Sequence, residues 1–105
     1  MIYVTPILVN RHKDTFDIYI GRGTIWGNPH PIDPGQGISR QISIEMYREH
    51  LYACLEDGRI TVDDMLSLSG KRIGCSCAPL PCHGDVIIEA FNAAVEMLEE
   101  RGSDE

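Results

Sequence analysis

The sequence predicts a small α/β sandwich of about three strands, at least two of them parallel, with three helices and a Rossmann-like, right-handed helical crossover. The 105 residues are 43% hydrophobic and 24% charged, a composition typical of one globular domain. Short β-rich segments alternate with longer segments whose apolar residues recur at helical spacing. We therefore expect a single domain over residues 1–101 and a flexible acidic tail over residues 102–105.

Two short strands are expected before the first helix. Ile2–Val9 is rich in strand-forming residues, and Pro6 within it predicts an edge strand or an irregular one. Phe16–Ile20 predicts a second, short strand. Residues 21–37 are too rich in glycine and proline for regular structure, and a loop of this length in so small a domain is usually functional or disordered.

The longest helix is expected between the loop and Gly58. Ser39 is a good N-cap residue, and apolar residues at helical spacing continue from there to Asp57. Tyr47 and Cys54 fall on this apolar stripe. We therefore expect both of them in the core and not in a chemical site.

The second half of the chain completes the parallel sheet. Thr61 with Asp64 forms a capping box for a short second helix. Lys71–Gly74 predicts a third strand, parallel to the second one. A third helix begins near Cys82 or His83, and apolar residues mark its buried face.

The expected topology predicts where a ligand would bind. In parallel sheets, ligands collect beyond the carboxyl ends of the strands. Here those ends lead into residues 21–29 and residues 75–85. We therefore expect these two loops to meet and to form a cleft.

The charge of the chain limits its partners. The net charge is −7, and residues 75–105 hold seven acidic residues but one basic residue, whereas residues 1–40 carry a net charge of +1. The acidic balance argues against broad duplex DNA binding but allows a local anion site near the amino terminus. No stretch approaches the roughly 18 consecutive apolar residues of a membrane span, so we expect no membrane partner and a cytoplasmic protein.

Three thiols and an imidazole crowd into nine residues, as Cys75, Cys77, Cys82 and His83. In a reducing compartment, such clustering indicates metal binding or catalysis. The four side chains would supply a Cys₃His set for zinc, which is the cofactor to consider. Neighbouring side chains diverge at a helix start, so another histidine can replace His83. The candidates for that replacement are His12, His30 and His50.

Two other interpretations of the cluster stay open. In the first, Cys82 is a nucleophile or redox thiol, because a helix amino terminus and an adjacent imidazole lower a thiol pKa. His83 would then act as the base, and Asp85 would orient it or contact a substrate hydroxyl. In the second, Cys75 and Cys77 are small core residues, while His83 and Asp85 cap the third helix.

The loop after the second strand offers an anion site. Its glycines allow close backbone approach to a ligand, its amides can form an anion nest, and Arg22 supplies a planar fork for phosphate or carboxylate. Trp26 either stacks on a base or fills the core beneath the loop. Asn28 and Asp85 would hydrogen-bond a sugar or base. The candidate ligand-binding residues are Gly21, Arg22, Gly23, Trp26, Gly27, Asn28 and Arg40.

Five short motifs carry a resemblance to a known family. They are Tyr-Ile-Gly-Arg from Tyr19, Trp-Gly-Asn-Pro from Trp26, Ser39-Arg40, Tyr47-Arg48 and Cys-x-Cys-Ala-Pro-Leu-Pro-Cys-His-Gly-Asp from Cys75. From about residue 3 to residue 95, the chain resembles a family of small phage and bacterial proteins classed as a domain of unknown function. The resemblance implies a single α/β domain among phage accessory proteins, with a nucleotide-related or host-takeover role. The positions shared with the family are Gly21, Arg22, Gly27, Asn28, Pro29, Cys75, Cys77, Cys82, His83 and Asp85.

Two functional hypotheses follow. In the first, a small accessory protein binds a nucleotide-like or other anionic small molecule between residues 21–29 and 75–85, with catalysis by Cys82 or His83. In the second, zinc staples a small fold whose surface binds another protein. We favour the first hypothesis, because a staple does not explain the glycine-rich loop.

Overall fold

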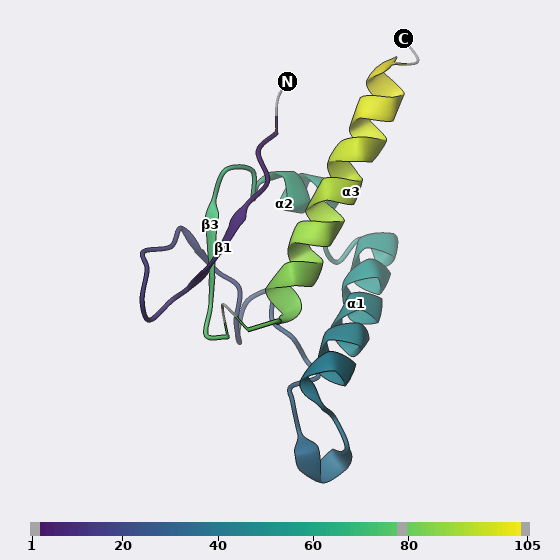
Figure 1. Ribbon diagram of the computed structural model, residues 1–105. Coiled ribbons are helices and arrows are strands. Elements are labelled where there is room, and N and C mark those ends of the chain that lie inside the picture. Colours follow the sequence, from purple (N-terminus) through teal and green to yellow (C-terminus); the bar gives the residue numbers. More distant parts are fainter. Residues whose placement is uncertain (1–2, 78–79, 104–105) are drawn as a thin grey trace.

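The computed structural model describes residues 3–77 and 80–103. Within these residues the chain forms three parallel strands and three α-helices (Figure 1). The predicted α/β class is confirmed. The elements in chain order are β1 (Ile7–Asn10), β2 (Ile18–Tyr19), the 3₁₀ helix η1 (Pro34–Gln36), α1 (Arg40–Asp57), α2 (Val62–Leu66), β3 (Arg72–Cys75) and α3 (His83–Ser103).

The sheet has the strand order β1-β3-β2, so the last strand in sequence lies in the middle. Ile73 of β3 is in register with Leu8 on one side and with Ile18 on the other, and both pairings are parallel. The predicted parallel pairing of the second and third strands is confirmed. Because β1 begins only after Pro6, it is shorter than expected, and it lies at the sheet edge as the proline predicts.

The helix starts follow the local sequence. The Oγ of Ser39 accepts a hydrogen bond from the backbone N–H of Ile42 at the start of α1. Thr61 and Asp64 form both hydrogen bonds of the predicted capping box at the start of α2. The backbone of α3 continues to Ser103, whereas residues 1–2, 78–79 and 104–105, including the end of the expected tail, lie outside the described residues.

The core lies between the sheet and the helices. In Figure 1 the helices lie on one side of the sheet and the connection between β1 and β2 lies on the other. On that second side, Phe16 covers Gly74, where a Cβ atom would come within 2.8 Å of the Phe16 ring. Tyr47 and Cys54 are buried among the helices, which confirms their predicted place in the core.

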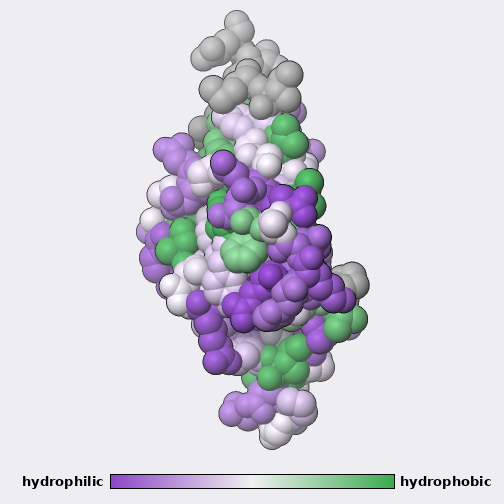
Figure 2. Space-filling view, turned by 90° about the vertical axis from the view of Figure 1, so that its left-hand side faces the viewer, coloured by the Kyte–Doolittle hydropathy of each residue, from purple (hydrophilic) through white to green (hydrophobic). Residues whose placement is uncertain are grey.

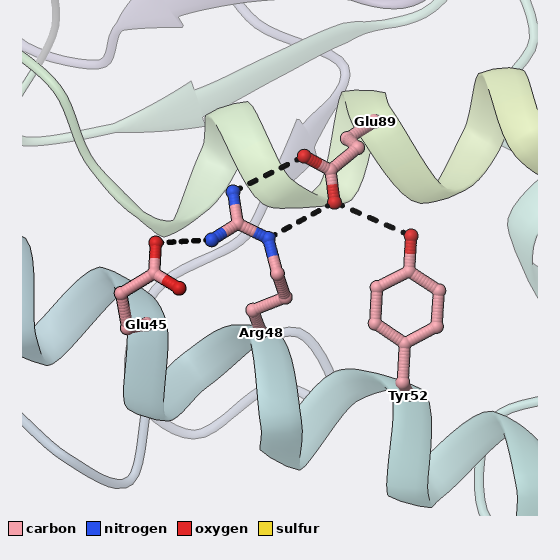
Figure 3. A network of polar contacts seen from close by, with 4 residues as sticks. All are labelled: Glu45, Arg48, Tyr52 and Glu89. Atoms are coloured by element: carbon pink, nitrogen blue, oxygen red, sulfur yellow. Dashed lines mark hydrogen bonds and ion pairs between the residues drawn. The ribbon is translucent and has the colours of Figure 1, made fainter.

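An ion-pair network joins the exposed sides of α1 and α3 (Figure 3). Two nitrogens of Arg48 each lie 3.1 Å from a carboxylate oxygen of Glu89, and Arg48 also contacts Glu45. The Tyr52 hydroxyl donates to the same Glu89 at 3.3 Å. Because these groups are partly exposed, we expect the network to contribute at most about 1 kcal/mol to stability.

The surface is mixed in character. Figure 2 shows a mainly hydrophilic face with several separate hydrophobic patches, one of which lies in the lower part of the view. Ile32 and Ile42, on either side of η1, are 41% and 47% exposed. None of the helices in the described part of the chain is both long enough and apolar enough to cross a bilayer.

The buried hydroxyl of Tyr47 gives a first prediction. It donates to the backbone carbonyl of Trp26 at 2.7 Å. Since Tyr47→Phe would leave that buried carbonyl without its donor, we expect the free energy of unfolding to fall by about 1–3 kcal/mol in urea denaturation. The matched control is Tyr52→Phe, because Tyr52 is exposed. This variant should lower the free energy of unfolding by less than about 0.5 kcal/mol. Equal losses in the two variants would contradict this interpretation.

Candidate functional site

A pocket of about 310 Å³ lies at the carboxyl ends of β2 and β3. It forms between residues 21–29 and residues 75–85, so the structure brings the two unusual segments together. The first turns of α1 and α3 complete its wall. The lining residues are Tyr19, Gly21, Arg22, Asn28, Pro31, Ile32, Arg40, Ser43, Ile44, Cys75, Ser76, Cys77, Pro81, Cys82 and His83.

The charges around this pocket favour an anion. Arg22 is exposed, and no hydrogen bond or ion pair ties its side chain to any other described residue. Arg40 donates from Nη1 to the carbonyl of Pro81 at 2.9 Å, which fastens the start of α1 to the second loop. None of the lining side chains is a carboxylate. Residues from the first turns of two helices, whose amino termini carry partial positive charge, also line the pocket.

At the start of α3, the side chains of Cys82 and Asp85 both accept hydrogen bonds from backbone N–H groups. The backbone N–H of Gly84 donates to the Cys82 Sγ at 3.3 Å, and the backbone N–H of Cys82 donates to the Asp85 carboxylate at 3.1 Å. Asp85 is exposed and is not among the pocket-lining residues. Its observed contact therefore supports the capping interpretation and shows no orienting bond to a base.

Burial dominates the chemistry of Cys82. Its side chain is 4% exposed, and its Sγ lies 3.5 Å from the Sγ of Cys75. Burial is the largest cause that raises the pKa of the Cys82 thiol to about 12, although the bond from Gly84 acts in the opposite direction. We expected a lowered pKa at a helix amino terminus. The observed direction is the reverse, so at neutral pH this group is a thiol and not a nucleophilic thiolate.

His83 points away from Cys82. Its Nε2 lies 2.7 Å from the carbonyl oxygen of Ile20, and its ring packs edge-on against Tyr47 at a centroid distance of 4.9 Å. Burial lowers the pKa of His83, which favours the neutral ring. A neutral ring that donates its Nε2 proton to Ile20 has Nδ1 as its acceptor. The bond to Ile20 thus orients the His83 ring and leaves Nδ1 as its acceptor atom, but His83 has no hydrogen bond to Cys82 in the described part of the structure.

The four predicted zinc ligands do not surround a common point. Over residues 3–77 and 80–100, no three or more histidine, cysteine or acidic side chains are placed to hold one metal ion. Cys75 and Cys82 are in contact, Cys77 is half-buried in the same pocket wall, and His83 is directed to Ile20. The other histidines have different neighbours. His12 contacts Arg11, whereas His30 and His50 face each other.

The glycine-rich loop is built from its own contacts. The N–H of Thr24 donates to the Gly21 carbonyl, and the N–H of Gly27 donates to the Thr24 carbonyl, so these two amides are already bonded within the loop. A Cβ atom on Gly27 would lie 2.8 Å from the Gly21 carbonyl oxygen, which explains the glycine there. Gly23 has a φ of +85° in the turn and lies outside the pocket lining.

Trp26 belongs to the core. Its side chain is 5% exposed, and it is absent from the pocket lining. The structure places Trp26 in the core beneath the loop, which is one of the two roles considered for it. The physical reason is the bond from Tyr47 to the Trp26 carbonyl, which holds this part of the loop against α1.

Asn28 lines the pocket while its amide holds the loop in place. Its Nδ2 donates to the Oγ of Ser43 at 2.9 Å, and its Oδ1 accepts the backbone N–H of His30 at 2.8 Å. The Ser43 hydroxyl in turn donates to the His30 carbonyl. The side-chain amide of Asn28 already fastens the loop to α1. A sugar or base that bound to Asn28 would therefore have to share this amide with Ser43 and His30.

Sequence reasoning did not select Tyr19, Ser43 or Ile44 as pocket residues. The guanidinium of Arg11 lies 5.0 Å from the centre of the Tyr19 ring, and the hydroxyl end of that ring lies over Gly21, where a Cβ atom would come within 2.1 Å of it. Helical spacing would have revealed the other two, since positions 43 and 44 share a face with position 40.

The raised pKa of Cys82 gives a second prediction. A thiol whose pKa is about 12 in the folded state and 9.0 ordinarily binds its proton more tightly when folded, so its stabilising effect is complete below pH 9 and disappears toward pH 12. In reducing buffer, we expect the unfolding free energy of the wild type to fall more steeply above pH 9 than that of Cys82→Ala, by up to about 1.4 kcal/mol per pH unit. Cys77→Ala should keep the wild-type slope. Parallel curves for wild type and Cys82→Ala would contradict the shift.

Comparison with known proteins places the chain in a family. Residues 8–93 match the family model described as domain of unknown function DUF4326. The chain is also similar to the uncharacterised 12.4 kDa protein in the nrdA–td intergenic region of Enterobacteria phage T4, with 41% identity over 85 residues that cover 81% of this chain and 76% of the phage protein. No solved structure matches it. The family resemblance expected from the motifs is confirmed, and the chain belongs to the DUF4326 family.

Proposed function

We propose that this protein binds a small anionic molecule, of which a nucleotide-like phosphate ester is the main candidate, in the pocket between residues 21–29 and 75–85. One observation carries the proposal. Arg22 and Arg40 line a pocket without carboxylates, at the point where the first turns of α1 and α3 meet the carboxyl ends of two parallel strands. This arrangement of cations and helix amino termini favours an anion.

The two arginines would have different roles. Arg40 is held by the Pro81 carbonyl, so its guanidinium is positioned before a ligand arrives. Arg22 is exposed and has no polar bond to another described side chain, so it is available to form a two-pronged contact with phosphate. Tyr19, Ile32 and Ile44 add an apolar wall against which the body of a nucleotide would pack.

The proposal is restricted to binding. The thiol of Cys82 stays protonated at neutral pH, since burial raises its pKa to about 12. His83 also lines the pocket, and burial lowers its pKa, so its ring is neutral there and adds no positive charge. We infer a cytoplasmic location for this binding activity, because four cysteines that form no disulfide in the structure suit a reducing compartment.

Ligand-induced stabilisation tests the anion site. Against a panel of nucleoside mono-, di- and triphosphates, nucleosides and inorganic phosphate, we expect at least one phosphate-containing compound to raise the Tm by several degrees, whereas the matching nucleoside does not. A ligand at ten times its Kd stabilises the folded state by about 1.4 kcal/mol. Arg22→Ala and Arg40→Ala should each weaken binding at least tenfold.

The matched control is Arg59→Ala. Arg59 is also an exposed arginine, but it follows the carboxyl end of α1, and Arg40 begins that helix about 27 Å away. The control variant should bind as tightly as the wild type. If all three arginine variants lose the same affinity, or if Arg22→Ala and Arg40→Ala leave every shift unchanged, the proposed site is wrong.

A second candidate, a zinc-stapled interaction module, has one contact in its favour, the 3.5 Å separation between the sulfurs of Cys75 and Cys82. A zinc site would need at least one further ligand, from Cys77 or His83, to turn toward this pair. Elemental analysis of the purified protein decides the matter. A zinc staple predicts about one zinc per chain and its loss, together with the fold, in Cys77→Ser. Protein that holds no zinc and melts at the same temperature in that variant would exclude it.

A further inference from the structure

A second hollow lies between the three helices and is separate from the anion pocket. It has a volume of about 300 Å³, and its lining shares no residue with the pocket at the strand ends. Met97, Val62 and Tyr52 around it are 57%, 47% and 39% exposed, which is unusual for large hydrophobic side chains on one surface. We call it the helical groove.

The shape of the helical groove suits another helix. Ala90, Ala93 and Ala94 of α3 contribute small side chains that let a backbone approach closely. The part of α3 that lines the groove, residues 90–98, extends about 12 Å, the length of two helical turns. In Figure 1, α3 extends well past the end of α1, so part of its length has no neighbouring long helix. Met97 adds an adaptable side chain at the rim.

The charge around the helical groove is negative. Glu56 is the charged residue of its lining. Asp63 follows Val62 on α2 and Glu96 precedes Met97 on α3, and both carboxylates are exposed. The lining contains neither lysine nor arginine. The groove is thus an apolar hollow whose charged lining residue is acidic, whereas the charged lining residues of the anion pocket are arginines.

This charge decides between possible occupants. A second copy docked groove to groove would bring two acidic surfaces together and would supply no lysine or arginine from its own groove lining, which costs binding energy. An anionic lipid surface would be repelled for the same reason. A helix with an apolar face and basic flanks would instead bury Met97 and Val62 and pair its cations with the carboxylates.

We propose that the helical groove docks an amphipathic helix of another protein, with leucine-like residues on its buried face and lysine or arginine on its flanks. The probe is a fluorescein-labelled 18-residue peptide of leucine and lysine arranged as an amphipathic helix. Titration with the protein, followed by fluorescence anisotropy, should give saturable binding. Met97→Lys and Val62→Lys should each weaken it at least tenfold, and Glu56→Gln should weaken it and reduce its salt dependence.

Ile42→Lys is the matched control. Ile42 is 47% exposed, as Val62 is, and also lies in the first turn of a helix, but it is not part of the helical groove. This variant should change the affinity less than twofold. Circular dichroism would check that each variant is folded, and the conservative Glu56→Gln keeps the test valid if a lysine variant unfolds.

Three results would overturn the proposal. Equal weakening in Ile42→Lys would show only general attraction between a basic peptide and an acidic protein. Equal binding of a leucine–glutamate peptide would remove the role of charge. A concentration-dependent dimer in sedimentation that Met97→Lys abolishes would identify a second copy as the occupant.

Discussion

The Tyr47 hydroxyl donates to the Trp26 carbonyl in the interior of the protein, and the walls of the pocket depend on this contact. Tyr47 belongs to α1, so the bond fixes the loop after β2 to that helix. The same ring packs edge-on against His83 at the start of α3, while His83 reaches the carbonyl of Ile20. One buried aromatic side chain therefore positions a loop, a helix start and a strand end. Since an unpaired buried carbonyl is costly, loss of the Tyr47 hydroxyl would weaken the attachment of the loop to α1.

Much of the fold could be predicted because the signals are local. Caps such as Ser39 and Thr61 lie a few residues from the groups that they satisfy, and apolar spacing placed Tyr47 in the core. The site was harder to predict, because its roles depend on long-range neighbours. Nothing near Trp26 in sequence reveals the hydroxyl that fastens it to α1, and nothing near Asn28 reveals the Ser43 hydroxyl that its amide meets.

The thiol cluster shows how competing effects are decided by burial. A helix amino terminus lowers a thiol pKa, and the bond from Gly84 acts on Cys82 in this direction. Loss of water around a side chain that is 4% exposed outweighs this effect, and the neighbouring Cys75 adds to the rise. The dense motif at the end of β3 therefore divides into two parts. Asp85 caps α3 outside the pocket lining, Cys77 forms part of the pocket wall, and Cys82 belongs to both parts.

The net charge of −7 is distributed unevenly over the molecule. The pocket lies where α3 begins, and its charged lining residues are arginines, whereas Glu96 and Glu99 lie in the last turns of α3, up to about 25 Å along the helix. Carboxylates near a helix carboxyl terminus are disfavoured by the helix dipole, so their position does not stabilise α3. Their physical effect is a negative potential at the far end of the helix. With a Debye length of about 8 Å at physiological ionic strength, that potential is screened before it reaches the arginines. The arginines at the pocket and the carboxylates near the end of α3 therefore form two electrostatically independent regions of one short chain.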